Sequence, residues 1–154
     1  MVLRKEIVKK NIVINNSDFD IDKIYKKVKE KAESMGYFFV EKEQWLRSGK
    51  YGGEVRFRFY LGREVDYFGS LEFDLDLDFN ELSKVKNLDH GNCKVTIKGT
   101  VTFDSKNKWG MTRFNKFLLG LYLKVADPMM KKNYLIPLIK EGNELHDFIK
   151  EQFE

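Results

Sequence analysis

The sequence predicts an α+β protein in which an antiparallel sheet of about five strands packs on C-terminal helices. The segment Leu71–Phe79 has a large apolar residue at every odd position and a carboxylate at every even position. On a strand this alternation gives one apolar face and one charged face. Glu54–Leu61 and Cys93–Phe103 alternate in the same way. After Asp104 the apolar period becomes helical, which places helices behind the sheet.

The alternation also predicts which side chains of the sheet are buried. The predicted core residues are Leu71, Phe73, Leu75, Leu77, Val95, Ile97 and Val101. The carboxylates that lie between them are expected on the solvent face, and these are Glu72, Asp74, Asp76 and Asp78.

Two turns set the expected register. A turn over Gly62–Asp66 that pivots near Glu64 would place Arg56 opposite Glu72, with the apolar pairs Phe57–Leu71 and Val55–Phe73 beside it. A connection over Asn80–Asn92 that pivots near Lys86 would place carboxylates beside lysines, in the pairs Asp74–Lys98 and Asp78–Lys94. Such exposed pairs contribute only ~0.2–1 kcal/mol each, so they fix the register more than they stabilise the fold. Gly99 interrupts the apolar rhythm and indicates a bulge or a close approach to the sheet.

The N-terminal third predicts a strand, a helix and a second strand. Ile7–Ile14 is rich in branched residues, as is typical of a strand. Asp18 or Asp20 is expected to cap the helix that follows, and Gly36 is expected to end it. Tyr37–Leu46 is the next predicted strand. The apolar positions of the helix are Ile21, Ile24, Tyr25, Val28, Ala32 and Met35.

The C-terminal third predicts two helices. One begins near Trp109, and its apolar side includes Phe114, Phe117 and Tyr122. Asp127-Pro128 is a typical helix start, so a second helix should follow it to the C-terminus. We expect that helix to be kinked or interrupted at Pro137.

Composition favours a single domain over residues 1–154. The chain is 42% hydrophobic, and its 28 Lys and Arg residues against 24 Asp and Glu residues give a net charge of only +4. This excess is too small to indicate a nucleic-acid binder without a concentrated patch. Cys93 is the only cysteine, which favours a reducing compartment. The longest apolar run, Phe117–Leu123, is far shorter than a membrane span. A cytoplasmic protein is expected.

Residues that could carry chemistry do not form a catalytic pattern. Alternate aspartates on a strand stand nearly 7 Å apart, too far for Asp74, Asp76 and Asp78 to share one ion unaided. His90 and His146 lack the spacing of a zinc site. Cys93 begins an apolar strand face, so it is expected to be buried. We therefore expect no metal, no cofactor and no catalytic residue, although the sequence does not exclude an enzyme.

The segment around residues 111–123 has a second apolar face, formed by Met111, Leu119 and Leu123. An ordinary surface helix would be polar there, so the final helix, a ligand or another subunit should cover it. A protein-interaction or self-association module is therefore one hypothesis. A weaker one is binding to RNA or anionic membranes through the basic-aromatic cluster Lys106–Lys116.

The predicted element order resembles the helix-grip fold of the START and Bet v 1-like superfamily. In that fold a curved sheet wraps a long C-terminal helix, and many members hold apolar ligands between the two. This chain departs from the pattern, with about five strands rather than seven and one helix after the first strand rather than two. A further segment looks like a small archaeal family, a resemblance that implies no function. The residues that carry it are Trp109, Phe114-Asn115-Lys116-Phe117-Leu118, Leu121-Tyr122, Glu144-Leu145 and Ile149-Lys150.

The favoured hypothesis is non-catalytic binding of an apolar or amphipathic small molecule between the sheet and the C-terminal helix. Aromatic residues dominate the predicted inner faces, as in many ligand pockets. Gly99 and Gly120 would leave room, and Tyr122 or Tyr134 would orient a polar end. The same aromatics could instead fill a solid core. The residues expected to line the site are Phe57, Phe59, Phe73, Gly99, Phe114, Phe117, Gly120, Tyr122 and Tyr134.

Overall fold

The computed structural model describes residues 3–49, 52–66, 69–85, 88–103, 128 and 131–153. Over these residues the chain is α+β, as predicted, with one antiparallel sheet of five strands in the order β1-β5-β4-β3-β2. The strands are β1 (Leu3–Phe19), β2 (Phe38–Gly49), β3 (Gly52–Glu64), β4 (Gly69–Val85) and β5 (Leu88–Phe103). The helices are α1 (Ile21–Ser34), a π-helical segment (Lys131–Leu135) and α4 (Ile136–Glu151).

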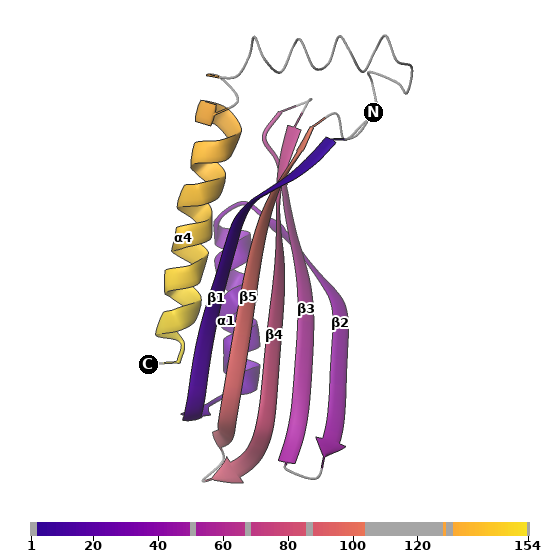
Figure 1. Cartoon of the computed structure of the whole chain (residues 1–154), viewed down its shortest axis with the longest axis vertical. Coiled ribbons are helices and arrows are strands. Elements are labelled where there is room, and N and C mark those ends of the chain that lie inside the picture. Colours follow the sequence, from indigo (N-terminus) through magenta and orange to yellow (C-terminus); the bar gives the residue numbers. More distant parts are fainter. Residues whose placement is uncertain are drawn as a thin grey trace.

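Both α-helices cover the same face of the sheet, which we call the inner face (Figure 1). Helix α1 packs its Tyr25 ring 5.3 Å from the ring of Phe59 on β3. Helix α4 brings Gly142 against Val8 of β1 and Phe73 of β4. The inner-face side chains of the central strand, among them Leu71, Phe73 and Leu75, are fully buried. The core is therefore the layer between the sheet and the two helices.

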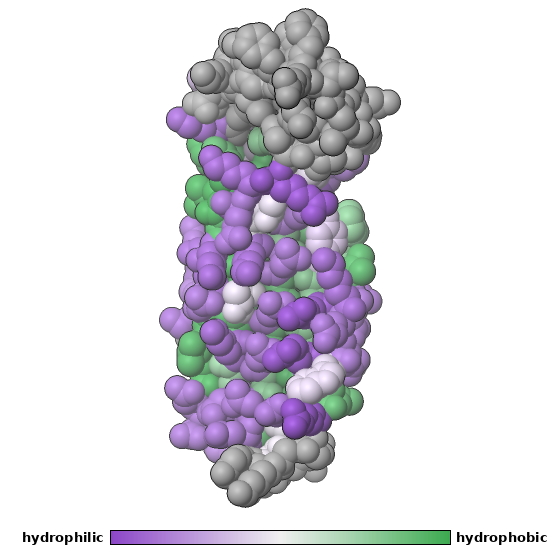
Figure 2. Space-filling model, turned by 45° about the vertical axis from the view of Figure 1, so that its right-hand side comes forward, coloured by the Kyte–Doolittle hydropathy of each residue, from purple (hydrophilic) through white to green (hydrophobic). Residues whose placement is uncertain are grey.

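The predicted core of the sheet is confirmed. The seven predicted core residues are at most 1% exposed, and they are Leu71, Phe73, Leu75, Leu77, Val95, Ile97 and Val101. The carboxylates of β4 point to the other face, which we call the outer face, where they are half-buried rather than fully exposed. Three of them lie beside basic side chains, in the pairs Asp74–Lys42, Asp76–Arg58 and Asp78–Arg56. Figure 2 shows that hydrophilic side chains dominate the described surface in this view.

The register of the β4–β5 hairpin is confirmed, because Asp74 lies opposite Lys98 and Asp78 lies opposite Lys94. The predicted connection Asn80–Asn92 is wrong. Strand β4 continues to Val85 and β5 begins at Leu88, with an irregularity between Asn80 and Ser83. Glu81 has a positive φ of 52° there, so the chain absorbs an extra residue within the ladder instead of leaving it.

The predicted register of the β3–β4 hairpin is wrong by six residues. Arg56 lies opposite Asp78 rather than Glu72, and the apolar pairs are Phe57–Leu77 and Val55–Phe79. Gly62, taken for a turn residue, lies within β3, and the ring of Phe38 fills the space where its side chain would be. The turn forms later, where the Asp66 carboxylate accepts a hydrogen bond from the Gly69 amide at 2.9 Å.

The predicted helix ends of α1 are confirmed. Of the two candidate caps, Asp20 is the one used, and its carboxylate accepts a hydrogen bond from the Lys23 amide at 3.1 Å. Gly36 follows the helix with a φ of 84°. Near the expected kink or interruption at Pro137, the helix changes from π-helical over Lys131–Leu135 to α-helical from Ile136, and Pro137 lies in the first turn of α4. The helix predicted from Trp109 lies outside the described residues.

Candidate functional site

The structure brings three of the predicted ligand-lining aromatics into the core under the helices. Phe57, Phe59 and Phe73 are 5%, 1% and 0% exposed. Their rings contact other aromatic rings, with centroids 5.6 Å apart for Phe57–Phe59 and 5.4 Å apart for Tyr37–Phe73. These side chains thus pack against protein atoms rather than against an open space.

Gly99 permits a close approach, as predicted, but the room beside it is occupied. A Cβ atom at Gly99 would lie 2.9 Å from the Phe73 ring and 3.0 Å from Val8. The partner strand is irregular at this point, between Glu6 and Val8. The glycine therefore lets Phe73 pack onto the backbone of β5 and leaves no vacancy there.

Tyr134 lies far along the sheet from Phe57. Its ring packs against Gly69 and stands 5.1 Å from the Phe103 ring, and its hydroxyl donates to the Asp66 carboxylate. Phe57 pairs with Leu77, eight positions along β4 from Gly69. At ~3.3 Å per residue this separates the two contacts by roughly 26 Å. One small ligand does not reach both.

The other predicted site residues lie outside the described residues. For the ligand site these are Phe114, Phe117, Gly120 and Tyr122, and for the interaction face they are Met111, Leu119 and Leu123.

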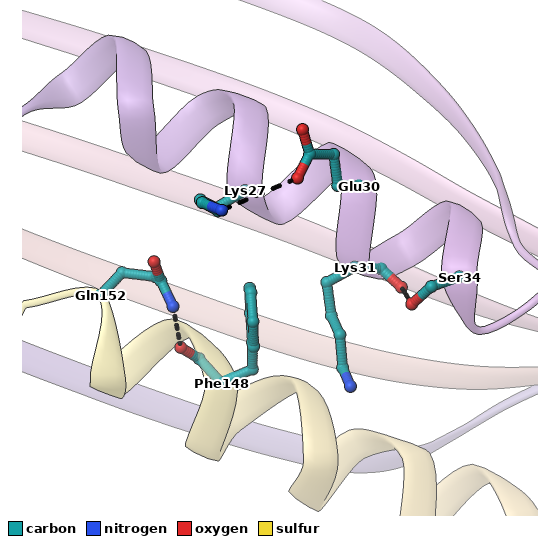
Figure 3. Close-up of a pocket in the computed structure, with 6 residues that line it drawn as sticks. All are labelled: Lys27, Glu30, Lys31, Ser34, Phe148 and Gln152. Carbon is teal, nitrogen blue, oxygen red and sulfur yellow. Dashed lines mark hydrogen bonds and ion pairs between the residues drawn. The ribbon is translucent and has the colours of Figure 1, made fainter.

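A concavity of about 360 Å³ opens between α1 and α4 (Figure 3). We call it the helix groove. Helix α1 contributes Lys27, Glu30, Lys31 and Ser34, while Phe148 and Gln152 come from the C-terminal end of α4. In the close-up the Phe148 ring projects from α4 towards α1, between Gln152 and the side chain of Lys31. An aromatic surface and two lysine side chains thus border the same space.

The helix groove follows from the residue spacing on the two helices. Val28 and Ala32 of α1 are fully buried, and so are Leu145 and Ile149 of α4. Side chains four residues apart lie on one side of a helix. Lys27 and Lys31 of α1 and the pair Phe148 and Gln152 of α4 therefore form two neighbouring edges.

The lysines of the helix groove differ in how firmly they are held. The Lys31 amine lies 2.7 Å from the Glu144 carboxylate and 5.4 Å from the centre of the Phe148 ring. The Lys27 amine has Glu30 at 4.0 Å, and both of these side chains are largely exposed. Exposed pairs of this kind are weak, so the Lys27 amine can turn towards an anion with little loss.

Sequence reasoning missed the helix groove. None of the six residues that line it is among the site residues predicted from the sequence. A signal was present, because Phe148 and Ile149 are adjacent and one narrow helix stripe cannot bury both. Ile149 is fully buried and Phe148 is only half-buried at the edge of the stripe.

A network of hydrogen bonds around Glu141 connects α4 to the sheet. Arg63 of β3 donates to both carboxylate oxygens of Glu141, at 2.7 and 2.9 Å, and the Tyr37 hydroxyl donates to the same carboxylate. Burial, and then the hydrogen bond to Glu141, raises the pKa of Tyr37 above its usual value. This network joins α4 to β3 and to the Tyr37 side chain.

The titratable groups that the sequence singled out are spread over the fold. Cys93 is 2% exposed, and burial raises the pKa of its thiol. His90 contacts Asp18 and His146 contacts Asp147, both through Nδ1. Within the described ranges, no three His, Cys, Asp or Glu side chains converge as metal ligands would.

Neither α1 nor α4, nor the π-helical segment, is long and apolar enough to cross a membrane; this holds for the described part of the chain. No protein-family profile matches the chain, and no curated protein matches it in sequence.

Proposed function

We propose that this protein is a non-catalytic binding module that holds an amphipathic small molecule in the helix groove. The site lies between α1 and α4, beside the sheet–helix layer that the sequence favoured. We place the site in the groove rather than between the sheet and the C-terminal helix because that layer is packed: Phe57, Phe59 and Phe73 contact other side chains there.

The observation that carries the proposal is the pairing of an aromatic surface with lysine amines across one concavity. A volume of about 360 Å³ falls at the lower end of the range for small-molecule sites. Phe148 offers a flat apolar surface, and Lys27 and Lys31 stand on the opposite edge. This combination suits a ligand with an aromatic or aliphatic body and an anionic head.

The topology is in keeping with the helix-grip resemblance. A helix follows the first strand, the first strand pairs with the last, and a long helix closes the chain. In helix-grip proteins the last helix contributes to the ligand site. We infer the same use of α4 here, through its Phe148 side rather than through its buried side.

Binding of anilinonaphthalene sulfonate, a fluorescent aromatic anion, tests the proposal. Phe148→Ala and Lys27→Glu should each weaken binding by about tenfold or more, because each removes one half of the amphipathic site. Lys29→Glu makes the same charge change on the same helix but away from the groove, so its affinity should match that of the unmodified protein. Circular dichroism verifies that each variant is folded. Equal affinity in all four proteins, or no binding at all, contradicts the proposal.

A further inference from the structure

Strand β2 forms one edge of the sheet (Figure 1). It carries exposed apolar side chains. Phe38, Val40 and Leu46 are 56%, 44% and 68% exposed. An edge strand also presents backbone donors and acceptors that can pair with another strand. Apolar side chains on such an edge are typical of an interface.

A bulge at Lys42 divides β2 into two halves. Glu41 lies opposite Phe59 and Glu43 lies opposite Arg58, so Lys42 is an extra residue in the ladder. Its amine stands 3.7 Å from the Asp74 carboxylate and 5.0 Å from the centre of the Tyr60 ring, on the outer face. The bulge therefore reverses the alternation of faces along the strand.

The register with β3 assigns each β2 side chain to a face. Before the bulge, Phe39 and Glu41 lie on the inner face and Phe38 and Val40 on the outer face. At the bulge and after it, the outer-face residues are Lys42, Glu43 and Trp45, and the inner-face residues are Gln44 and Leu46.

We propose that β2 pairs antiparallel with β2 of a second copy of this chain, about a two-fold axis that passes between Lys42 and Glu43. In this register Lys42 lies opposite Glu43 of the partner subunit, and Glu43 lies opposite Lys42 of the partner subunit. The two strands then place four alternating charges around the axis. Opposite charges in directly facing positions stabilise a strand pair.

The next three pairs on either side of the charged ones agree in face. Val40 faces Trp45 of the partner subunit on the outer face, and Phe39 faces Leu46 of the partner subunit on the inner face. Glu41 faces Gln44 of the partner subunit, also on the inner face. Residues that face each other across an antiparallel ladder must point to the same side of the sheet.

Neighbouring registers fail this condition. If the axis moves by half a residue onto Lys42, then Glu41 on the inner face lies opposite Glu43 of the partner subunit on the outer face. Both residues are also acidic. If the axis moves onto Glu43, then Lys42 on the outer face lies opposite Gln44 of the partner subunit on the inner face. A shift of one full residue in either direction brings Glu41 against Lys42 or Glu43 against Gln44, again inner against outer. The bulge thus selects the one local register that pairs the charges.

Charge reversal gives a test of partner and register together. Analytical ultracentrifugation of the full chain at low salt should show a concentration-dependent dimer. Lys42→Glu places four acids around the axis, and Glu43→Lys places four bases there, so each variant should raise the dimer dissociation constant by about tenfold or more. An equimolar mixture of the two variants restores opposite charges across the axis and should form a heterodimer. The double variant Lys42→Glu/Glu43→Lys should dimerise like the unmodified protein.

Val13 supplies a matched control, since it is 61% exposed on the outer face of β1, at the opposite edge of the sheet. Val40→Glu should abolish the dimer, whereas Val13→Glu should leave it intact. A monomer at all concentrations overturns the proposal. So does a dimer that both single charge reversals leave unchanged, or a mixture of the two variants that stays monomeric.

Discussion

Arg63 on β3 donates two hydrogen bonds to the carboxylate of Glu141 on α4. Both come from the terminal nitrogen Nη2, at 2.7 Å to Oε1 and 2.9 Å to Oε2. The two side chains are only 27% and 20% exposed, and Tyr37 donates to the same carboxylate. A polar contact beside the apolar core thereby joins the sheet to the last helix.

Removing this carboxylate should cost more stability than removing an exposed one. Glu141→Ala leaves a half-buried guanidinium and a buried hydroxyl without their partner, so the free energy of unfolding should fall by about 1–3 kcal/mol. Glu144→Ala, which removes the largely exposed partner of Lys31, should cost about 1 kcal/mol or less. Urea unfolding of both variants measures the difference. Equal losses would show that the Arg63–Glu141 contact does not anchor α4.

Gly99→Ala tests whether the inner layer is filled. The added methyl group would lie 2.9 Å from the Phe73 ring and 3.0 Å from Val8, so we expect a loss of about 1–3 kcal/mol in the free energy of unfolding. Phe73→Leu makes space at the same point. The double variant should therefore lose less than the sum of the two single losses, as measured in a double-mutant cycle. Additive losses would mean that the two residues do not share one filled space.

Asp20→Ala removes the N-cap of α1. Because the Asp20 carboxylate accepts the Lys23 amide, its loss should lower the free energy of unfolding by about 0.5–2 kcal/mol. Asp18→Ala is the matched control, since Asp18 contacts only the exposed His90 side chain among the interactions described for it. Chemical denaturation should show a clearly smaller effect for Asp18. A larger loss of stability for Asp18→Ala than for Asp20→Ala would contradict the assignment of Asp20 as the N-cap.

Tyr37 should make stability fall at alkaline pH. Its pKa is raised in the folded state by burial and by Glu141, while in the unfolded chain it stays near 10.0. The contribution of Tyr37 to the free energy of unfolding is therefore complete below pH 10. It is lost as the pH rises above 10, because there only the unfolded state releases the hydroxyl proton. The slope approaches ~1.4 kcal/mol per pH unit for one proton. Tyr37→Phe should show a shallower decline than the unmodified protein in urea unfolding between about pH 9 and 11. Equal slopes would contradict the assignment.

The faces of the sheet could be predicted from the sequence, but the register of one hairpin could not. Arg56 has an acidic partner on the same face in both arrangements, Glu72 in the predicted one and Asp78 in the structure. Any shift by an even number of residues keeps apolar opposite apolar. Only the position of the turn distinguishes the predicted register from the observed one. Gly62 resembles a turn residue more than a strand residue, so the predicted turn comes too early in the sequence.

The helix groove could not be predicted for a different reason. It depends on how closely α1 and α4 lie on the inner face, and that distance follows from packing between residues far apart in the sequence. The Lys31 amine, for example, meets Glu144, which is 113 positions away. Periodicity within each helix shows which side is buried, but not which exposed edges face each other.

Nuclear magnetic resonance titration of the isotopically labelled protein with anilinonaphthalene sulfonate tests the central proposal most directly. If the helix groove is the site, the largest amide shifts should cluster at residues 27–34 and 148–152, while the core strand residues Phe73 and Val95 should hardly move. Shifts centred on Phe73 and Val95, or on the β2 edge at Val40, would contradict the helix groove as the binding site.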